Sequence, residues 1–397
     1  MKVSPDLTND SRAKRRVSIL GATGSIGCNT LDLVRNQSDL FTIEALTGNK
    51  NVDLLISQAK EFNPKLAVIG DDALFGELKD GLSGTDIAAA SGQTALLEAA
   101  DVDSDIVIAG IVGVAGLAPT LKAAQRGAIV ALANKECLVC AGDFFLDEIE
   151  RSGATLLPID SEHNAIFQVF DFEQSENVDH LTLTASGGPF RNASLTEMSA
   201  VTPEQAVAHP NWDMGAKISV DSATMMNKGL ELIEAFYLFP VEEKQIEILI
   251  HPQSVIHSMV SYKDGSVLAQ LGTPDMRTPI SYALAWPDRM ETPGRQLDLA
   301  QIGKLTFEAP DLERFPALTL ARDTLKAGGS LPTILNAANE VAVRCFLEER
   351  IGFLDITRVT ADVLDRTPNS EPNTLDEICH CDEAARVLAE EMVSALI

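Results

Sequence analysis

The chain is poor in aromatic residues and in cysteine. Aromatic residues make up 5% of its 397 residues, although hydrophobic residues make up 45%. Such a composition is typical of α/β proteins with aliphatic, alanine-rich cores, and it disfavours a β-sandwich. The 6 cysteines do not form a disulfide framework in a chain of this length. We therefore expect a large hydrophobic core divided between two or three domains.

Positive charge is also scarce. The chain has 31 Lys and Arg residues against 58 Asp and Glu residues, which gives a formal net charge of -27 at pH 7. This balance excludes a general affinity for nucleic acid or for anionic membranes. An anionic substrate must therefore be attracted locally, by lysines and by the N-termini of helices.

Long apolar runs are missing as well. No run reaches the roughly 20 residues that span a bilayer. Residues 1–16 are polar and lack the apolar core of a signal peptide. We expect a disordered leader at 1–15, no membrane partner and a cytoplasmic location.

The first third of the chain alternates short apolar runs with helical periods. This order is typical of a doubly wound parallel sheet, so we predict a Rossmann-like α/β domain at 16–157. A first strand begins at Arg16. Later strands are expected at 41–47, 66–69, 106–108 and 129–133, and helices at 28–36, 52–62 and 117–126.

The rest of the chain follows other patterns. Asp264-Gly265 is a strong hairpin signal between two apolar runs. We expect a central α+β catalytic domain at 158–290, on an antiparallel or mixed sheet. A proline-rich connector at 291–317 and a C-terminal helical bundle at 318–397 should follow. The expected strands of the central domain are 181–185, 246–250, 254–260 and 267–271.

Three glycines indicate a dinucleotide site. Gly21, Gly24 and Gly27 lie where the first strand leads into the first helix, and such a junction can bind a pyrophosphate. An NAD-binding domain places a carboxylate after its second strand, but residues 47–51 contain Lys50 and no carboxylate. The sequence therefore favours NADP(H). An ordinary glycine turn and a polar surface loop are the alternative interpretation.

A second group of polar residues lies at 222–231. We expect one helix that begins near Asp221–Ser222, with Asn227, Lys228 and Glu231 on one face. A hydroxyl near a helix N-terminus, an amide and an ammonium favour a phosphate, while the carboxylate needs a cation beside it. The alternative is a solvated amphipathic helix with a Lys–Glu pair.

Asp160 and Glu162 form an acidic pair after an apolar strand. In an extended segment both side chains point the same way, and a hard divalent cation would relieve their repulsion. Glu231 could supply a third oxygen ligand, in a set that suits Mg²⁺ or Mn²⁺ rather than Zn²⁺. Solvated surface carboxylates are the alternative. Ser186, in a glycine-rich turn, offers another hydroxyl to an anion.

Long motifs occur in order along the chain and closely resemble those of the 1-deoxy-D-xylulose 5-phosphate reductoisomerase family, from about residue 16 to the C-terminal helices. One departure is Asn49, where the family often has glycine. The motifs are Gly21-Ala-Thr-Gly-Ser-Ile-Gly27, Ala133-Asn-Lys-Glu136, Pro158-Ile-Asp-Ser-Glu-His-Asn-Ala-Ile-Phe-Gln168, Ser186-Gly-Gly-Pro-Phe-Arg191, His209-Pro-Asn-Trp-Asp-Met-Gly215, Val220-Asp-Ser-Ala-Thr-Met-Met-Asn-Lys-Gly229 and His251-Pro-Gln-Ser-Val-Ile-His257.

The resemblance implies a role for each matching residue. The implied NADPH-binding residues are Thr23, Gly24, Ser25, Ile26, Asn49, Lys50, Asn51, Asn134, Glu136 and Gly215. The implied substrate-binding residues are Lys135, Ser161, Glu162, Ser186, His209, Trp212, Ser222, Asn227, Lys228 and Glu231. The implied metal ligands are Asp160, Glu162 and Glu231, and with Lys135 and His209 they would form the catalytic set.

The resemblance also implies a reaction. A homodimer would rearrange and reduce 1-deoxy-D-xylulose 5-phosphate to 2-C-methyl-D-erythritol 4-phosphate, in non-mevalonate isoprenoid synthesis. The cofactors would be NADPH and Mn²⁺ or Mg²⁺, with Co²⁺ as a further candidate. Trp212, on a loop at 209–215 without helical or strand period, would cover the substrate.

Two other functions compete with this one. A plain NADP-dependent dehydrogenase of the homoserine or semialdehyde type would not need three converging carboxylates. A non-catalytic NADP(H) sensor would need neither a phosphate site nor a metal site. Turnover that depends on a metal separates both from a reductoisomerase.

Overall fold

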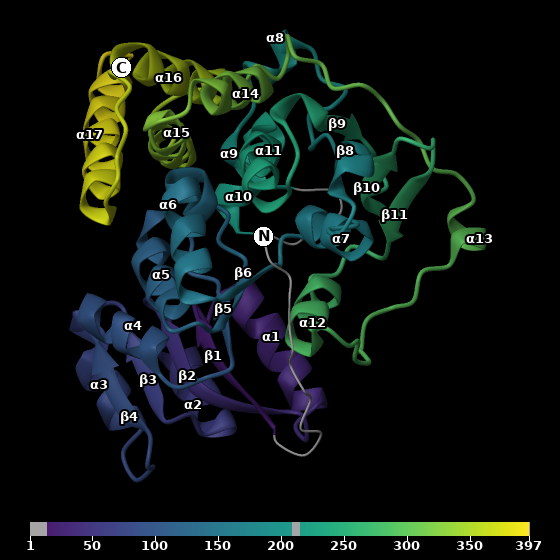
Figure 1. Cartoon of the computed structure of the whole chain (residues 1–397). Coiled ribbons are helices and arrows are strands. Elements are labelled where there is room, and N and C mark those ends of the chain that lie inside the picture. The colour runs from purple at the N-terminus through teal and green to yellow at the C-terminus, as the bar shows by residue number, and fades with distance from the viewer. Residues whose placement is uncertain (1–13, 209–214, 397) are drawn as a thin grey trace. The chain divides into compact units, whose positions relative to one another are not determined.

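The structure, a computed structural model, describes residues 14–208 and 215–396. Its chain folds into two compact units, and Figure 1 labels their elements. The first unit comprises residues 14–137, 145–164 and 275–295. The second comprises residues 138–144, 165–208, 215–274 and 296–396. The domain boundaries at 157, 290 and 317 and the leader stay predictions, and residues 1–13 of that leader lie outside the described part.

The first unit is built on a seven-stranded sheet in the order β4-β3-β2-β1-β5-β6-β7, in which all neighbours are parallel. This confirms the predicted doubly wound α/β fold. The strands are β1 (Arg15–Leu20), β2 (Phe41–Gly48), β3 (Leu66–Ile69), β4 (Ala88–Ser91), β5 (Ile106–Ala109), β6 (Ile129–Leu132) and β7 (Thr155–Pro158).

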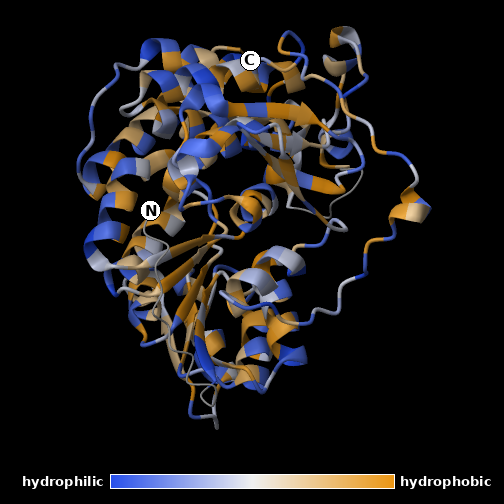
Figure 2. Ribbon diagram, turned by 45° about the vertical axis from the view of Figure 1, so that its right-hand side comes forward, coloured by the Kyte–Doolittle hydropathy of each residue, from blue (hydrophilic) through white to orange (hydrophobic). Residues whose placement is uncertain are grey.

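Aliphatic residues explain why the central strands lie in the middle of this unit. Val17 and Ile19 of β1 and Ile106 and Ile108 of β5 are completely buried, as strands covered on both faces require. Figure 2 shows the strands of this sheet as mostly hydrophobic ribbon. The edge strand β4 was not predicted, because its sequence Ala-Ala-Ala-Ser lacks the β-branched residues that signal a strand.

Helices connect the parallel strands, as crossovers require. Helix α6 contains one residue with non-helical angles, Ala141 (φ -140°, ψ 28°). The helices are α1 (Ser25–Asn36), α2 (Val52–Phe62), α3 (Phe75–Gly81), α4 (Gly92–Asp101), α5 (Leu117–Gln125), α6 (Glu136–Ser152), α7 (Ser161–Val169), which continues into the second unit, and α12 (Arg277–Ala285). Short 3-10 turns lie at Asp72–Leu74 and Val114–Gly116.

The second unit contains a four-stranded mixed sheet in the order β11-β10-β8-β9. Strand β10 is antiparallel to β8 and β11, whereas β8 and β9 are parallel. The predicted hairpin is confirmed, because Gly265 has a φ of 89° and the Asp264 carboxylate accepts from the amide of Ser266 at 2.8 Å. The strands are β8 (Val178–Ala185), β9 (Ile246–Ile250), β10 (Ile256–Tyr262) and β11 (Val267–Leu271).

Helices complete the second unit and confirm the predicted helical C-terminal region. Helices α15, α16 and α17 contact one another, and α14 lies against α11. The helices are α8 (Leu195–Met198), α9 (Pro203–Val207), α10 (Ala216–Thr224), α11 (Met226–Leu238), α13 (Leu299–Ile302), α14 (Ala317–Ala327), α15 (Leu331–Leu347), α16 (Phe353–Arg366) and α17 (Leu375–Ser394). Short 3-10 turns lie at Ser175–Asn177 and Glu243–Gln245. Among the described residues, no helix is both long enough and apolar enough to cross a membrane.

The expected single helix from Asp221–Ser222 onward is wrong. Helix α10 ends at Thr224, Met225 adopts a left-handed conformation with a φ of 66°, and α11 starts at Met226. Ser222 therefore lies in the last turn of one helix, whereas Asn227 and Lys228 lie in the first turn of the next. Nothing in the residue types marks Met225 as a break, since left-handed angles are unusual for residues other than glycine.

Candidate functional site

The first unit gathers several predicted site residues at one edge of its sheet. β1, β2, β5, β6 and β7 are parallel, so their carboxyl ends lie at the same edge. Strand order reverses on the two sides of β1, where ligands of doubly wound sheets bind. The glycine turn, residues 49–51, residues 134–136 and Asp160 all follow these strand ends.

The glycine turn after β1 is shaped by close backbone contacts. Gly21 has a φ of 91°, and a Cβ added to it would lie 2.7 Å from the carbonyl oxygen of Gly110. A Cβ on Gly27 would lie 2.4 Å from the Cα of Ala22. The Gly21 amide donates to Thr47 Oγ1 at 2.8 Å. These two glycines are therefore required by the geometry of the turn.

The N-terminus of α1 is open to an anion. Gly24 caps the helix, and the first turn contains no acidic residue. Gly24 and Ser25 are exposed, while Thr23 and Ile26 are partly buried. Exposed amides at a helix N-terminus, without a competing carboxylate, favour a pyrophosphate.

The end of β2 presents a polar, mostly uncharged loop. Asn49 and Lys50 are exposed, and Asn51 caps α2 by accepting from the amide of Leu54 at 3.2 Å. Glu44 lies earlier in β2, where it is buried and pairs with Lys65 at 2.6 Å. The loop therefore offers a cation and an amide to a 2′-phosphate.

Three buried polar residues, Asn134, Lys135 and Glu136, follow the end of β6. Asn134 is 2% exposed, and its Nδ2 donates to the carbonyl of Gly113 at 3.0 Å. Its Oδ1 has no hydrogen-bond partner among the residues that the structure describes. Glu136 lies in the first turn of α6. Because a buried acceptor without a partner is costly, Asn134 Oδ1 is suited to a donor on a ligand.

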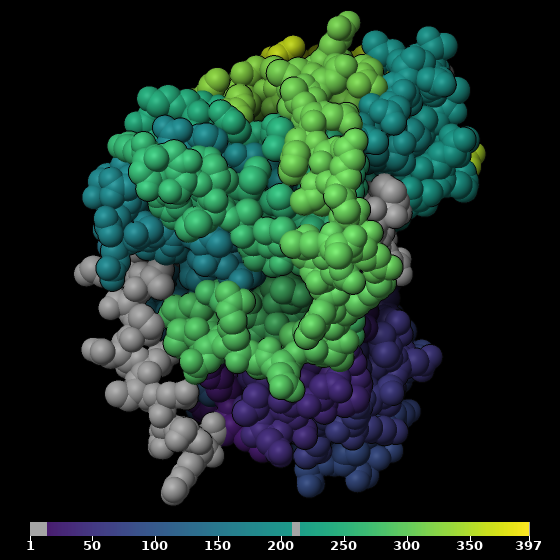
Figure 3. Space-filling model, turned by 90° about the vertical axis from the view of Figure 1, so that its right-hand side faces the viewer, coloured from purple at the N-terminus to yellow at the C-terminus, as the bar shows by residue number. Residues whose placement is uncertain are grey.

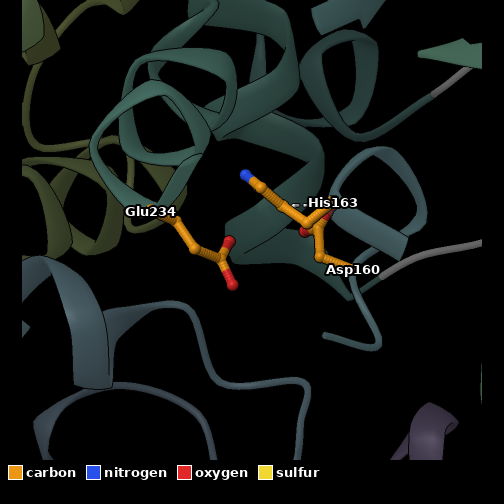
Figure 4. A group of neighbouring side chains, drawn as sticks. All are labelled: Asp160, His163 and Glu234. Atoms are coloured by element: carbon orange, nitrogen blue, oxygen red, sulfur yellow. Dashed lines mark ion pairs between the residues drawn. The ribbon is translucent and has the colours of Figure 1, made fainter. Parts of the chain in front are cut away.

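The Asp160 carboxylate has several polar neighbours within this unit. Lys135 Nζ donates to Asp160 Oδ2 at 2.5 Å, and the His163 Nδ1 atom lies 3.4 Å from Asp160 Oδ1. Figure 4 shows the Asp160–His163 pair. The Lys135 and Asp160 side chains are only 6% and 11% exposed, so solvent screens this pair weakly.

Glu162 lies next to Asp160, but not for the predicted reason. Residues 161–169 form α7, so the two acids are not in an extended segment. Instead, the Glu162 amide points at Asp160 Oδ1 at 3.4 Å, and the two carboxylates have oxygen atoms within 4.8 Å of each other. Ser161 donates to Glu162 Oε2 at 2.6 Å. The first turn of the helix, rather than strand alternation, therefore brings the acids together.

In the second unit, Ser186 and Ser222 come from neighbouring elements. Ser186 follows β8, and its Oγ accepts from the Gly188 amide at 3.1 Å. A Cβ on Gly188 would lie 2.7 Å from the carbonyl oxygen of Ser222. The turn at Ser186–Gly188 therefore lies directly against the last turn of α10.

Asn227, Lys228 and Glu231 share one face of α11, as predicted. Asn227 Nδ2 donates to Glu231 Oε1, and Lys228 Nζ donates to Glu231 Oε2. The Lys228 and Glu231 side chains are 5% and 2% exposed. The surface-helix alternative is therefore wrong, because this ion pair is buried. Buried charges are retained only with partners or ligands.

His257 was not assigned a role, although its motif was recognised. It is buried in β10, and burial lowers its pKa to about 4, with a further lowering by the charges of Lys228 and His251. The imidazole is therefore neutral at neutral pH. The local sequence gives no sign that His257 lies near Lys228 of α11, because only the folded sheet brings β10 close to that helix.

Of the predicted loop at 209–215, only Gly215 belongs to the described residues. Gly215 is exposed and caps α10, whereas His209 and Trp212 lie outside the described residues. The roles assigned to individual site residues stay predictions at this point.

Family models match most of the chain. Residues 17–142 match 1-deoxy-D-xylulose 5-phosphate reductoisomerase, residues 156–239 match its C-terminal domain, and residues 271–388 match a DXP reductoisomerase C-terminal domain.

Individual relatives are similar over nearly their full length. The 1-deoxy-D-xylulose 5-phosphate reductoisomerase of Rhodospirillum centenum is 58% identical over 100% of this chain and 98% of its own length. That of Zymomonas mobilis is 54% identical over 96% of this chain and 98% of its own.

Solved structures agree with these matches. The Zymomonas mobilis enzyme in complex with NADPH has a TM-score of 0.91 at 53% identity, over 96% of this chain and 99% of that one. A DOX-P reductoisomerase in complex with NADPH, fosmidomycin and magnesium has a TM-score of 0.91 at 44% identity, with the same coverage.

Proposed function

We propose that this chain, which belongs to the 1-deoxy-D-xylulose 5-phosphate reductoisomerase family, rearranges 1-deoxy-D-xylulose 5-phosphate and reduces the product with NADPH. The products are 2-C-methyl-D-erythritol 4-phosphate and NADP⁺, so one hydride and one proton are added to the rearranged carbon skeleton. The observation that carries the proposal is the buried Glu231, held by Asn227 and Lys228 in a family-specific motif. A plain dehydrogenase has no use for this cluster.

NADPH would bind at the carboxyl edge of the first sheet. The exposed amides of Gly24 and Ser25 would receive the pyrophosphate, with Thr23 and Ile26 beside them. Asn49 and Lys50 would receive the 2′-phosphate, while Asn51 shapes the loop by capping α2. Asn134 would use its unpaired Oδ1 toward the cofactor, together with Glu136 and Gly215.

Asp160, Glu162 and Glu231 would bind a divalent cation. The donor set fits Mg²⁺ or Mn²⁺, because all its ligand atoms are carboxylate oxygens. A bound ion would polarise the substrate carbonyl and stabilise negative charge on its oxygen. Lys135 would hold Asp160 in place through their 2.5 Å contact, and Ser161 would orient Glu162.

The substrate phosphate would bind in the second unit. Ser186 and Ser222 offer hydroxyls from adjoining turns, and Asn227 and Lys228 add an amide and an ammonium. Binding the phosphate far from the reacting carbons orients the substrate. His209 would contact the substrate, and Trp212 would cover it and exclude water; both residues lie outside the described part of the chain.

We also propose that the protein is a homodimer, with β11 as the contact. This strand is an edge of its sheet, and its Val267 and Leu268 are 54% and 49% exposed. Exposed apolar edge strands readily pair with another chain. Light scattering should give a dimer for the wild type and a monomer for Leu268→Lys.

One experiment tests the proposed reaction. The absorbance of NADPH is followed with the pentulose phosphate after exhaustive chelation, and again after Mn²⁺ or Mg²⁺ is added. We expect oxidation of NADPH only with the metal, and a branched polyol phosphate as product. Equal turnover without metal, or an unrearranged product, would contradict the proposal.

A further inference from the structure

The Ser186–Gly188 turn is enclosed on two sides. On one side, the backbone at Ser222 lies against Gly188. On the other, a Cβ on Gly187 would lie 2.8 Å from Arg191 Cδ and 3.0 Å from Ile250 Cγ2. Gly187 and Gly188 have φ angles of 82° and 68°, which glycine adopts readily. The Arg191 side chain therefore packs closely against the turn at Gly187.

The connector holds this arginine. Arg191 Nη1 donates to Glu308 Oε1 at 2.9 Å. The backbone of Glu308 is itself fixed, because it exchanges two hydrogen bonds of 2.9 Å with Ile250 in an antiparallel bridge. Ile250 pairs in turn with Ala185, the residue before Ser186. The ion pair and the bridge thus hold the turn and the end of β8 together.

A second arginine holds the chain that follows the turn. Arg314 Nη1 donates to the carbonyls of Arg191 and Ala193, at 2.8 Å each, and its Nε donates to Asp311 Oδ2 at 2.8 Å. We call Glu308, Asp311 and Arg314 the connector brace. Figure 3 shows the connector in light green at the surface of the molecule.

We propose that the connector brace, through Arg191, positions Ser186 and Ser222 for the phosphate of the substrate. This inference rests on the proposed function, which places the phosphate at these hydroxyls. Arg191 is 27% exposed and Glu308 is 49% exposed, so their pair adds little to overall stability. Its effect is local, because a small displacement of the turn changes the spacing of two hydroxyls that must meet one phosphate.

The test compares Arg191→Met, Glu308→Gln and the double variant with the wild type. The control is Arg344→Met, which removes an ion pair with Glu390 on other helices of the same unit. We expect the KM for the pentulose phosphate to rise about tenfold in each single variant. The double variant should be no worse than either single one, because both break one interaction. The KM for NADPH and all constants of the control should stay within about twofold.

Arg191→Lys tests which part of the arginine side chain is needed for a low KM for the pentulose phosphate. It keeps the aliphatic part that touches Gly187, so it should recover part of the affinity for the pentulose phosphate. If the Arg191–Glu308 pair only stabilised the fold, every variant of these two residues would have a lower Tm. The ratio of the KM for the pentulose phosphate to the KM for NADPH would then stay unchanged. That result would overturn the proposal while the reaction stands.

Calorimetry with inorganic phosphate distinguishes a failure of the connector-brace proposal from a failure of the proposed reaction. It measures phosphate binding to the folded protein without turnover. Weaker phosphate binding in Arg191→Met than in Arg344→Met supports the brace whether or not the wild type reduces the pentulose phosphate. Equal phosphate affinity in these variants overturns it.

Discussion

The carboxyl edge of the first sheet and the polar face of α11, the two proposed binding regions, offer different kinds of groups to a ligand. The sheet edge offers backbone amides and small residues, and its fit is set by contacts such as that of Gly21 with Gly110. The α11 face offers charged side chains, with Lys228 and Glu231 almost completely buried. One site is shaped sterically and the other electrostatically.

The contrast suits the two ligands. A dinucleotide is large and binds through many weak contacts, so close backbone approach matters most. A small phosphorylated sugar must be bound and activated by a few groups, and charges act most strongly where water is excluded. Mutations should therefore affect binding and stability at the sheet edge, but catalysis at α11.

Glu231→Gln should have the largest effect. It would remove one negatively charged ligand from the proposed cation site, while the amide keeps the size of the side chain. We expect kcat to fall by about 1000-fold, with the affinity for NADPH changed less than about twofold. Stopped-flow turnover and NADPH fluorescence titration would measure the two quantities. Glu390→Gln, at an exposed ion pair, is the matched control.

Gly21→Ala should be costly at the sheet edge. The alanine would have to adopt a φ of 91° and would meet the Gly110 carbonyl, so we expect a loss of about 2–4 kcal/mol in the free energy of unfolding. Gly24→Ala is the control, since its φ of -83° suits alanine and its nearest contact is an ordinary 3.5 Å. Equal stabilities in denaturant titration would show that the turn is not sterically set.

His257 should make the second unit sensitive to acid. Its pKa is lowered to about 4 by burial, so the unfolded state binds more protons between that pH and about 6.5. Stability is therefore lost as pH falls through this window. We expect a loss of about 2–3 kcal/mol on going from about pH 7 to about pH 4.5.

His257→Asn is the comparison for that experiment. Chemical denaturation at both pH values should give a smaller pH dependence in the variant, because its side chain does not titrate. The same pH dependence in both proteins would mean that other groups cause the acid sensitivity.

Lys50→Glu should have the smallest effect. Lys50 is exposed at the end of β2, so solvent screens its charge. Exchanging it for a carboxylate adds repulsion toward a 2′-phosphate, and we expect the preference of kcat/KM for NADPH over NADH to fall about tenfold. Lys60→Glu, on the same helix-loop unit but in the last turn of α2, should leave the preference unchanged. A wild type without any preference would contradict the assignment of the loop.

Much of the fold could be read from local pattern. The strand at 66–69 and the helix at 52–62 have the predicted bounds, because aliphatic β-branched runs and a capped amphipathic period are local signals. The same holds for the hairpin at Asp264-Gly265. Long, family-specific motifs also indicated the family to which the chain belongs.

Other features needed the tertiary structure. Met225, which is buried in the core of the second unit, adopts left-handed angles and breaks the expected helix. Helix α7 starts early enough to place Glu162 in a helical turn. The burial of Lys228 and Glu231 was equally invisible, since a charged helical face looks the same in sequence whether water or protein covers it. The sequence determined the elements and their chemistry, because those depend on near neighbours. Only the tertiary structure decided which charges are buried and how the connector reaches Arg191, because those contacts join residues far apart in the chain.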